Sequence, residues 1–292
     1  MTELLGFGAA LLGSALGGTA VAATRFAVGA IDPLNVAMLR YGIGALVLLP
    51  FAFRAVPRLK GKGDVAASVG LGLLFFALYP YAFALALKHT TAVRGSLALA
   101  TMPLMTLAFA ILLRQETFAW TRLAGVLVAM GGIAYALSPG LGAVAPEAWK
   151  GDLIMLAATA MQAVYNVLAR PYVQRIGALP FTAFGMVVGA IALACICAFL
   201  GLYGQLAGLT PLAWSAIAYL GLIGSALLWV LWGIGLRLAS PTMVALSVTA
   251  NVLTAAGLGA MVLGEPLGLE FAVGLLAVLL GIGVAMSWSR RQ

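Results

Sequence analysis

Residues 116–132 read ETFAWTRLAGVLVAMGG, and residues 265–281 read EPLGLEFAVGLLAVLLG. Both stretches begin with a glutamate at the end of an apolar segment, followed by a glycine nine residues later and another sixteen residues later. The two copies are offset by 149 residues, and at the same offset Lys88 has a basic counterpart in Arg237. The chain therefore consists of two similar halves.

The composition is that of a protein covered by lipid. Apolar residues make up 64% of the chain and charged residues 8%, and the mean hydropathy is +1.12. A soluble domain carries roughly 25% charged residues to cover its surface. The net charge of +8 is expected to reside in short cytoplasmic loops, so no nucleic-acid partner is predicted.

The predicted fold is an all-α integral membrane protein of about ten transmembrane helices, because about 20 apolar residues cross the hydrocarbon core. Five helices fall in each half, residues 1–140 and 150–290. Because five is an odd number, the second half must enter the membrane from the side opposite to the first. This 5+5 plan is the inverted repeat of many secondary transporters. The predicted helices are 4–26, 34–53, 65–87, 92–113, 118–138, 151–170, 178–200, 212–236, 241–262 and 268–288.

The basic residues predict the orientation, because lysine and arginine collect in cytoplasmic loops. With alternating helices, the loops on the side of the termini hold Arg54, Arg58, Lys60, Lys62, Arg114, Arg122, Arg170, Arg175, Arg237, Arg290 and Arg291. The opposite loops hold only Arg25, Lys88, Arg94 and Lys150. Both termini are therefore predicted to be cytoplasmic.

The chain resembles EamA-type members of the drug/metabolite transporter superfamily. The resemblance rests on the 5+5 plan, the repeated glutamate and glycine unit, and Pro103 ahead of Glu116. The resemblance covers nearly the whole chain, and among members it is most similar to YddG-type bacterial amino-acid exporters. It implies a multi-pass exporter of small metabolites in the bacterial inner (plasma) membrane. The ninth helix departs from the fourth by having Val252 where the fourth has Pro103, so no matching kink is predicted.

Two predicted helices carry a polar face in an otherwise apolar cylinder. The sixth has Gln162 and Asn166 one turn apart, and the ninth has Ser247 and Asn251 at the same spacing. Unpaired amides facing lipid are costly, so these faces must turn inward, either as contacts between helices or as the lining of a cavity. The candidate polar substrate contacts are Gln162, Asn166, Ser247, Asn251, Ser14 and Ser96.

Aromatic residues and one arginine complete the candidate site. Tyr79 and Trp229 lie away from the predicted interfaces and are candidate cavity walls, with packing inside the bundle as the alternative. Arg40 is a charge well inside a predicted helix. It is either a functional charge site or a long side chain that reaches the outer interface.

Three other ionisable residues have simpler interpretations. Glu116 and Glu265 repeat between the halves, but each comes just before a predicted helix and is expected to cap it. His89, the sole histidine, is expected in a solvated loop rather than in a proton relay.

The predicted function is a secondary transporter that exports small metabolites by alternating access around a central cavity between the halves. The best single substrate class is amino acids, aromatic and other largely apolar ones. The alternative is a channel, or a transporter of other small amphipathic solutes such as drugs or nucleosides. An enzyme is not expected, because the acids lie near predicted helix ends and no catalytic set of residues lies inside the bilayer.

The predicted partners are the small-molecule substrate and the lipid bilayer. No cofactor and no metal site are predicted, and the sequence leaves the oligomeric state open, compatible with a monomer. The absence of an acid inside a predicted helix favours a facilitator, in which the outward substrate gradient sets the direction. Proton coupling through Glu116 or Glu265 is the alternative.

Overall fold

The computed structural model describes residues 2–136, 138, 147–254 and 269–289, and these ranges contain helices and no strand. In the described residues, seven helices are long and apolar enough to cross a membrane, and three shorter apolar helices accompany them. The helices are α1 (Thr2–Ala30), α2 (Pro33–Ala52), α3 (Gly61–Leu73), α4 (Tyr79–His89), α5 (Ala92–Leu99), α6 (Met102–Leu112), α7 (Trp120–Ala136), α8 (Ala148–Ile176), α9 (Ala178–Phe199), α10 (Pro211–Gly221), α11 (Leu228–Leu238), α12 (Pro241–Leu246) and α14 (Leu269–Ser289).

Several helices begin where the sequence places a polar cap before a proline. The Asp32 carboxylate accepts a hydrogen bond from the Leu34 amide at 2.8 Å, at the start of α2. The Ser240 hydroxyl accepts one from the Met243 amide at 3.4 Å, at the start of α12. Proline fits the first helical turn because the amide that it lacks has no partner there. The predicted starts at both sites are confirmed.

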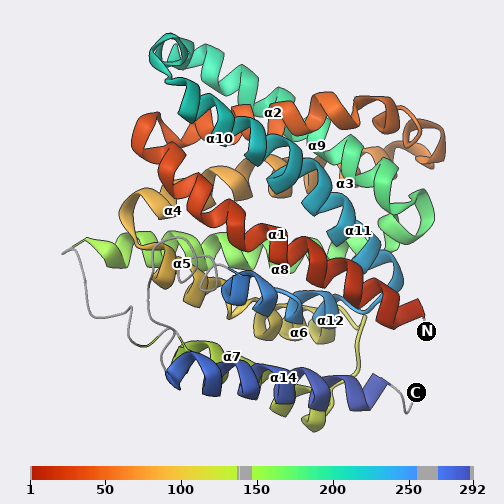
Figure 1. The fold of residues 1–292 in the computed structure, drawn as a ribbon. Helices are drawn as coiled ribbons and strands as arrows, with labels where there is room; N and C mark the ends of the chain where they lie inside the picture. The colour runs from red at the N-terminus through yellow and green to blue at the C-terminus, as the bar shows by residue number, and fades with distance from the viewer. Residues whose placement is uncertain (1, 137, 139–146, 255–268, 290–292) are drawn as a thin grey trace.

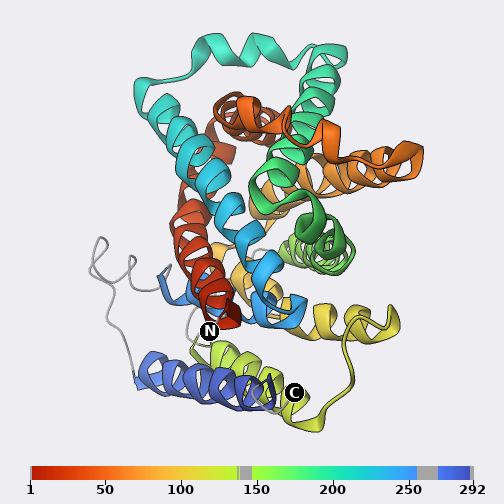
Figure 2. The same cartoon turned by 90° about the vertical axis from the view of Figure 1, so that its right-hand side faces the viewer.

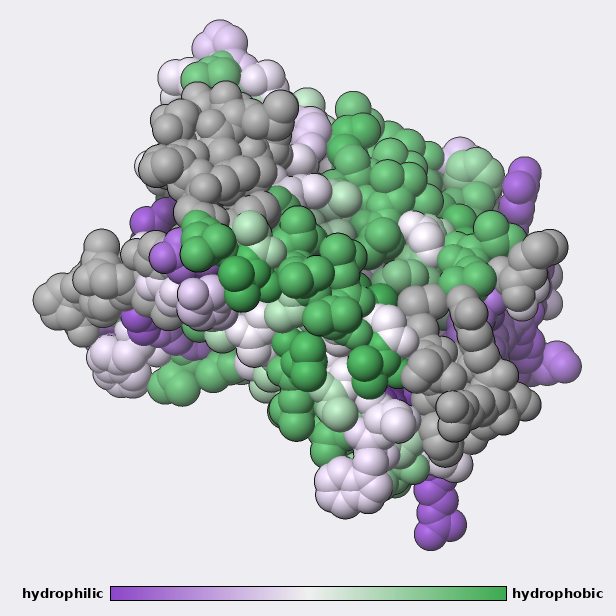
Figure 3. Space-filling model, turned by 60° about the horizontal axis from the view of Figure 1, so that its bottom comes forward, coloured by the Kyte–Doolittle hydropathy of each residue, from purple (hydrophilic) through white to green (hydrophobic). Residues whose placement is uncertain are grey.

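The helices form a main bundle with a separate two-helix layer along one side (Figure 1). The layer consists of α7 and α14, which lie side by side in both views (Figure 1, Figure 2). In the main bundle, the long helix α8 packs against α4, α5, α6 and α11. Seen from the side of the layer, hydrophobic residues cover the middle of the surface and hydrophilic residues gather toward the ends (Figure 3). This distribution is typical of a protein that spans a bilayer.

The repeated glycines form the contact between α7 and α14. A Cβ atom added to Gly125 would lie 2.6 Å from the Gly281 carbonyl oxygen, and one added to Gly281 would lie 2.5 Å from the Gly125 carbonyl oxygen. Gly132 and Gly274 meet in the same reciprocal way, at 2.7 Å and 2.5 Å. Without side chains between them the two backbones approach closely, which is how helices gain contact in lipid. The glycine pattern that marks each half therefore joins the two halves.

This contact makes a prediction about two adjacent glycines. Gly132→Ala is expected to destabilise the protein by about 1–3 kcal/mol, because its methyl group would overlap the Gly274 carbonyl and the Ala277 side chain. Gly131→Ala is the matched control, since a Cβ there meets nothing within 4 Å. Thermal unfolding in detergent compares the two variants. Equal midpoints for both variants would show that the α7–α14 contact is loose.

Two spans that the sequence predicts as continuous α-helices contain a π-helical segment. The span Gly61–His89 has one at Leu74–Leu78, and the span Pro211–Leu238 has one at Leu222–Leu227. These segments occupy equivalent places in the two halves, just before Tyr79 and Leu228. In a π-helix each hydrogen bond spans five residues instead of four, and such segments are rare and frequently lie at functional sites.

The fourth and ninth predicted helices are both interrupted. The fourth breaks at Ala100–Thr101, just before Pro103, as its proline predicts. The ninth also breaks, at Ser247–Val248, although Val252 replaces the proline, so the expectation of no matching kink is wrong. Its backbone tightens into three-residue turns, and the Ser247 hydroxyl donates to the Val244 carbonyl at 2.6 Å. A serine that bonds back to its own helix competes with the helical pattern and replaces the missing proline.

Candidate functional site: a central cavity

A cavity lies in the main bundle between helices of both halves. The free space in it that a water-sized sphere can occupy is about 40 Å³, and the site is partly open to the outside. Side chains from α1, α2, α4, α5, α8 and α11 line it, together with Val248 and Asn251 after α12. Three of the lining residues lie at the helix interruptions. Leu99 precedes the break in the fourth predicted helix, Val248 lies at the break in the ninth, and Tyr79 follows a π-helical segment.

The structure brings six of the predicted site residues to this cavity and leaves three behind its wall. The six are Ser14, Arg40, Tyr79, Gln162, Trp229 and Asn251. Asn166, Ser247 and Ser96 are buried, but they do not line the space.

Two amide oxygens at the cavity have no hydrogen-bond partner among the described residues. They are Gln162 Oε1 on α8 and Asn251 Oδ1 on the segment after α12. Gln162 is only 2% exposed. A buried acceptor without a partner costs about 1–3 kcal/mol, so each oxygen favours a donor that enters the cavity.

The residues behind the wall hold the lining in place. The Asn166 side-chain oxygen accepts a hydrogen bond from Trp232 Nε1 at 2.9 Å, which fixes an indole that lines the cavity. The Ser247 hydroxyl lies 3.0 Å from the Ser14 hydroxyl and thereby connects α1 to the break in the ninth helix. Ser96 is 4% exposed and makes no contact with the space.

The aromatic wall is a connected set of rings. Trp229 Nε1 donates to the Tyr41 hydroxyl at 2.9 Å, and the Trp229 ring packs edge-on against Phe75 with centroids 4.7 Å apart. Phe75 in turn stacks on Tyr165 at 3.9 Å and on Tyr79 at 5.1 Å. Rings held from several sides keep the wall rigid, since aromatic pairs add to the stability that burial provides.

Arg40 turns inward rather than toward the membrane surface. Its side chain lines the cavity, and the residue is 7% exposed. Its Nε donates to the Ser225 hydroxyl at 2.8 Å, and one terminal nitrogen donates to the Thr24 hydroxyl at 3.2 Å. The alternative in which Arg40 extends to the outer interface is therefore wrong.

Sequence reasoning missed several lining residues. Tyr41 and Leu99 come from helices for which no polar or aromatic face was proposed, and Pro80 and Gly17 resemble ordinary packing residues. Tyr41 directly follows Arg40, and this pairing of a cation with an aromatic residue inside a span is the signal that was available. The guanidinium carbon lies 5.4 Å from the centre of the Tyr41 ring.

At the end of the bundle where the N-terminus lies, Glu116 contacts a helix other than the predicted one. Its carboxylate pairs with Arg122 and accepts a hydrogen bond from the Thr242 amide at 3.0 Å. Thr242 is in the first turn of α12, so Glu116 caps a helix of the other half rather than its own helix α7. Glu265 lies outside the described residues.

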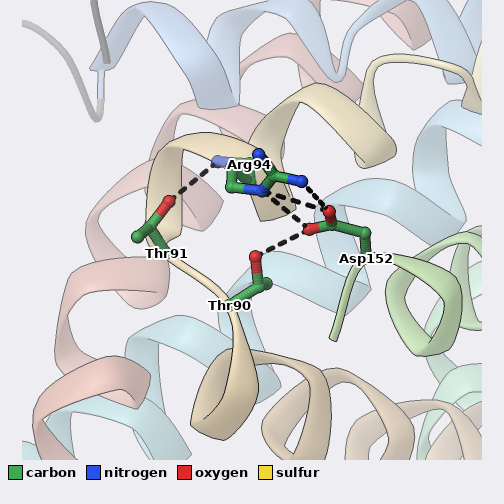
Figure 4. Close-up of polar contacts among 4 residues, drawn as sticks. All are labelled: Thr90, Thr91, Arg94 and Asp152. Atoms are coloured by element: carbon green, nitrogen blue, oxygen red, sulfur yellow. Dashed lines mark hydrogen bonds and ion pairs between the residues drawn. The ribbon is translucent and has the colours of Figure 1, made fainter. Parts of the chain in front are cut away.

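At the opposite end, an ion pair connects α5 to α8 (Figure 4). Arg94 Nε lies 3.2 Å and 3.1 Å from the two carboxylate oxygens of Asp152, and the Thr90 hydroxyl donates to Asp152 at 2.7 Å. The Thr91 hydroxyl caps α5 by accepting from the Arg94 amide at 3.3 Å. His89 is exposed, as predicted, but it lies in the last turn of α4 rather than in a loop.

Comparison with known proteins identifies the family. The family model for EamA-like transporters matches residues 4–138 and again residues 149–287. The chain belongs to the EamA-like transporter family. It is a membrane protein with transmembrane helices, and its family and relatives indicate transport of small molecules rather than an enzymatic activity.

Individual relatives agree with this assignment. The uncharacterized protein PA1977 of Pseudomonas aeruginosa is 33% identical over 266 residues, which cover 88% of this chain and 85% of that protein. The uncharacterized transporter YyaM of Bacillus subtilis is 25% identical over 221 residues, 73% of this chain and 71% of that protein. A solved crystal structure superposes with a TM-score of 0.77 at 24% identity, over 99% of this chain and 98% of that one, so the fold is shared.

Proposed function

We propose that this EamA-like transporter exports small metabolites, with aromatic and other largely apolar amino acids as the substrate class, by alternating access around the central cavity. The observation that carries the proposal is the pair of unpartnered oxygens, Gln162 Oε1 and Asn251 Oδ1, inside aromatic walls. The oxygens accept N–H groups such as an ammonium, and the rings of Tyr79 and Trp229 match an apolar side chain. The likeness to YddG-type exporters is part of this proposal.

The proposal includes the plan of ten spans in two inverted halves, with both termini in the cytoplasm of a bacterial cell. The cluster of Arg58, Lys60 and Lys62, before and at the start of α3, supports this orientation, because basic loops stay cytoplasmic. Cysteines placed at Lys62 and Gly208 are expected to react with impermeant reagents from opposite sides of the membrane. Labelling from one side only would contradict the plan.

Counterflow in proteoliposomes tests the function. Labelled phenylalanine is expected to accumulate against a trapped excess of the unlabelled amino acid, and the accumulation should saturate. Gln162→Leu and Asn251→Leu are expected to lower the rate about tenfold, because each removes a charge-assisted hydrogen bond to the ammonium. Cys195→Ser is the control, since Cys195 is exposed on the outside of the bundle. Equal exchange in all variants, or linear flux without saturation, would contradict a carrier with this cavity.

We also propose that the substrate moves down its own gradient. Among the described residues that line the cavity, the charged side chain is Arg40, and none is an acid that could carry a proton. An imposed pH gradient is therefore expected to leave the counterflow rate unchanged. Several-fold stimulation that disappears in Glu116→Gln would instead show coupling to protons through Glu116.

A further inference from the structure

Arg40 lies at the cavity as a cation held by three hydrogen bonds to neutral groups of the protein. The Gly224 carbonyl, in the π-helical segment Leu222–Leu227, accepts a hydrogen bond from one guanidinium nitrogen, and the Ser225 hydroxyl accepts another at 2.8 Å. A third bond reaches Thr24 on α1 at 3.2 Å. A guanidinium has five N–H groups, so donors remain for a further partner.

Among the described residues, no such cation lies at the π-helical segment of the first half, Leu74–Leu78. There, the Phe76 carbonyl is covered by Gly189 of α9, whose missing side chain allows the two backbones to touch. The two equivalent segments thus meet different neighbours, a glycine in one half and an arginine in the other. The cavity is therefore polarised, with positive charge on the side of α2 and α11.

No carboxylate neutralises Arg40 in the part of the chain that the structure describes. The four ion pairs there involve Arg94, Arg122, Lys150 and Arg175. The partners of Arg40 are two hydroxyls, one carbonyl and the Tyr41 ring, all of them neutral. A buried guanidinium without a counter-charge is costly, so an anion that enters the cavity is strongly favoured.

We propose that Arg40 binds the carboxylate of the transported solute, so that the substrates are molecules with a single carboxylate beside an apolar group. The proposal rests on the proposed function, since it assigns the substrate class of the same cavity. Carboxylates fit a guanidinium well because two oxygens accept two parallel N–H bonds. The same charge excludes solutes that carry only a cation, such as quaternary amines and decarboxylated amino acids.

The test measures binding rather than transport, with the purified protein in detergent. Two ligands of nearly equal shape, 3-phenylpropanoate and 3-phenylpropanamide, are titrated while the fluorescence of the cavity residues Trp229 and Trp232 is followed. The acid is expected to bind at least about tenfold more tightly than the amide, because a charged hydrogen bond contributes about 1.5–3 kcal/mol.

Variants separate recognition of charge from support of the fold. Arg40→Gln is expected to bind acid and amide equally, whereas Arg40→Lys keeps part of the preference for the acid. Cys195→Ser, on the outside of the bundle, is the control and is expected to keep the full preference for the acid.

Equal affinity for both ligands in the native protein, no binding of either, or an unchanged preference in Arg40→Gln would overturn the proposal. Preference for the acid without any counterflow would leave this binding assignment intact and contradict the transport function. Counterflow of phenylalanine together with equal binding of acid and amide would support the transport function and contradict the role of Arg40.

Discussion

Glu116→Ala is expected to lower the free energy of unfolding by about 3–5 kcal/mol, because it leaves Arg122 as a buried charge without a partner. The side chains of Glu116 and Arg122 are only 3% and 7% exposed. The same substitution also removes the acceptor for the Thr242 amide, so the first turn of α12 loses its cap. Thermal unfolding of the purified protein in detergent measures the loss.

A second ion pair provides the matched control for this prediction. Glu147 and Lys150 are 2.7 Å apart, but their side chains are 66% and 46% exposed. Water and salt screen such a pair, so Glu147→Ala is expected to leave the unfolding temperature nearly unchanged.

The double variant Glu116→Ala/Arg122→Ala separates the ion pair from the cap. It is expected to be more stable than the sum of the single variants predicts, since the buried charge is gone with its partner. Exact additivity would show that the two residues do not act as a pair.

Trp229→Ala is expected to abolish counterflow and to destabilise the protein by about 3–5 kcal/mol. Trp229 is 5% exposed, and its ring contacts those of Phe75, Tyr79 and Trp232. Its removal would leave a void at the centre of the aromatic wall and free its neighbours to move into the cavity. Counterflow and thermal unfolding measure the two effects separately.

Two conservative variants divide the role of Trp229 between its ring and its N–H group. Trp229→Phe keeps a ring but loses the hydrogen bond to the Tyr41 hydroxyl, and Tyr41→Phe loses the same bond from the other side. Both are expected to lose about 1 kcal/mol and to retain counterflow. A loss of activity in Tyr41→Phe as large as in Trp229→Ala would show that the hydrogen bond, and not the ring, matters.

The opposite ends of the bundle suggest how the halves are connected. Glu116 in the first half holds the start of α12 in the second, and Arg94 in the first half holds Asp152 near the start of α8. Each contact is polar and lies at a helix end; the Arg94 and Asp152 side chains are 22% and 23% exposed, whereas those of Glu116 and Arg122 are buried. In the alternating-access cycle that we propose, contacts at the two ends open in turn, whereas the tightly packed glycines between α7 and α14 do not fit that role.

Local patterns in the sequence determined the helices and their polar faces. The apolar runs and the Asp32-Pro33 and Ser240-Pro241 signals placed the starts of helices, because capping acts within a few residues. The spacing of Gln162 and Asn166 identified an inward face, since lipid excludes unpaired amides. The glycine pairs Gly125/Gly132 and Gly274/Gly281 were recognised as a repeat, although the contact between the two copies was not.

Only the tertiary structure decided which of these faces meet. Helical periodicity shows that Asn166 points inward, but its position behind Trp232 depends on how α8 and α11 pack. Arg40 and Ser225 are 185 residues apart and meet because the π-helical segment Leu222–Leu227 packs against α2. The Thr242 amide donates to the Glu116 carboxylate, although the two residues are 126 positions apart. The local sequence determines the chemistry of a side chain and the face of the helix on which it lies. Its contact partner depends on the packing of helices that are distant in the chain.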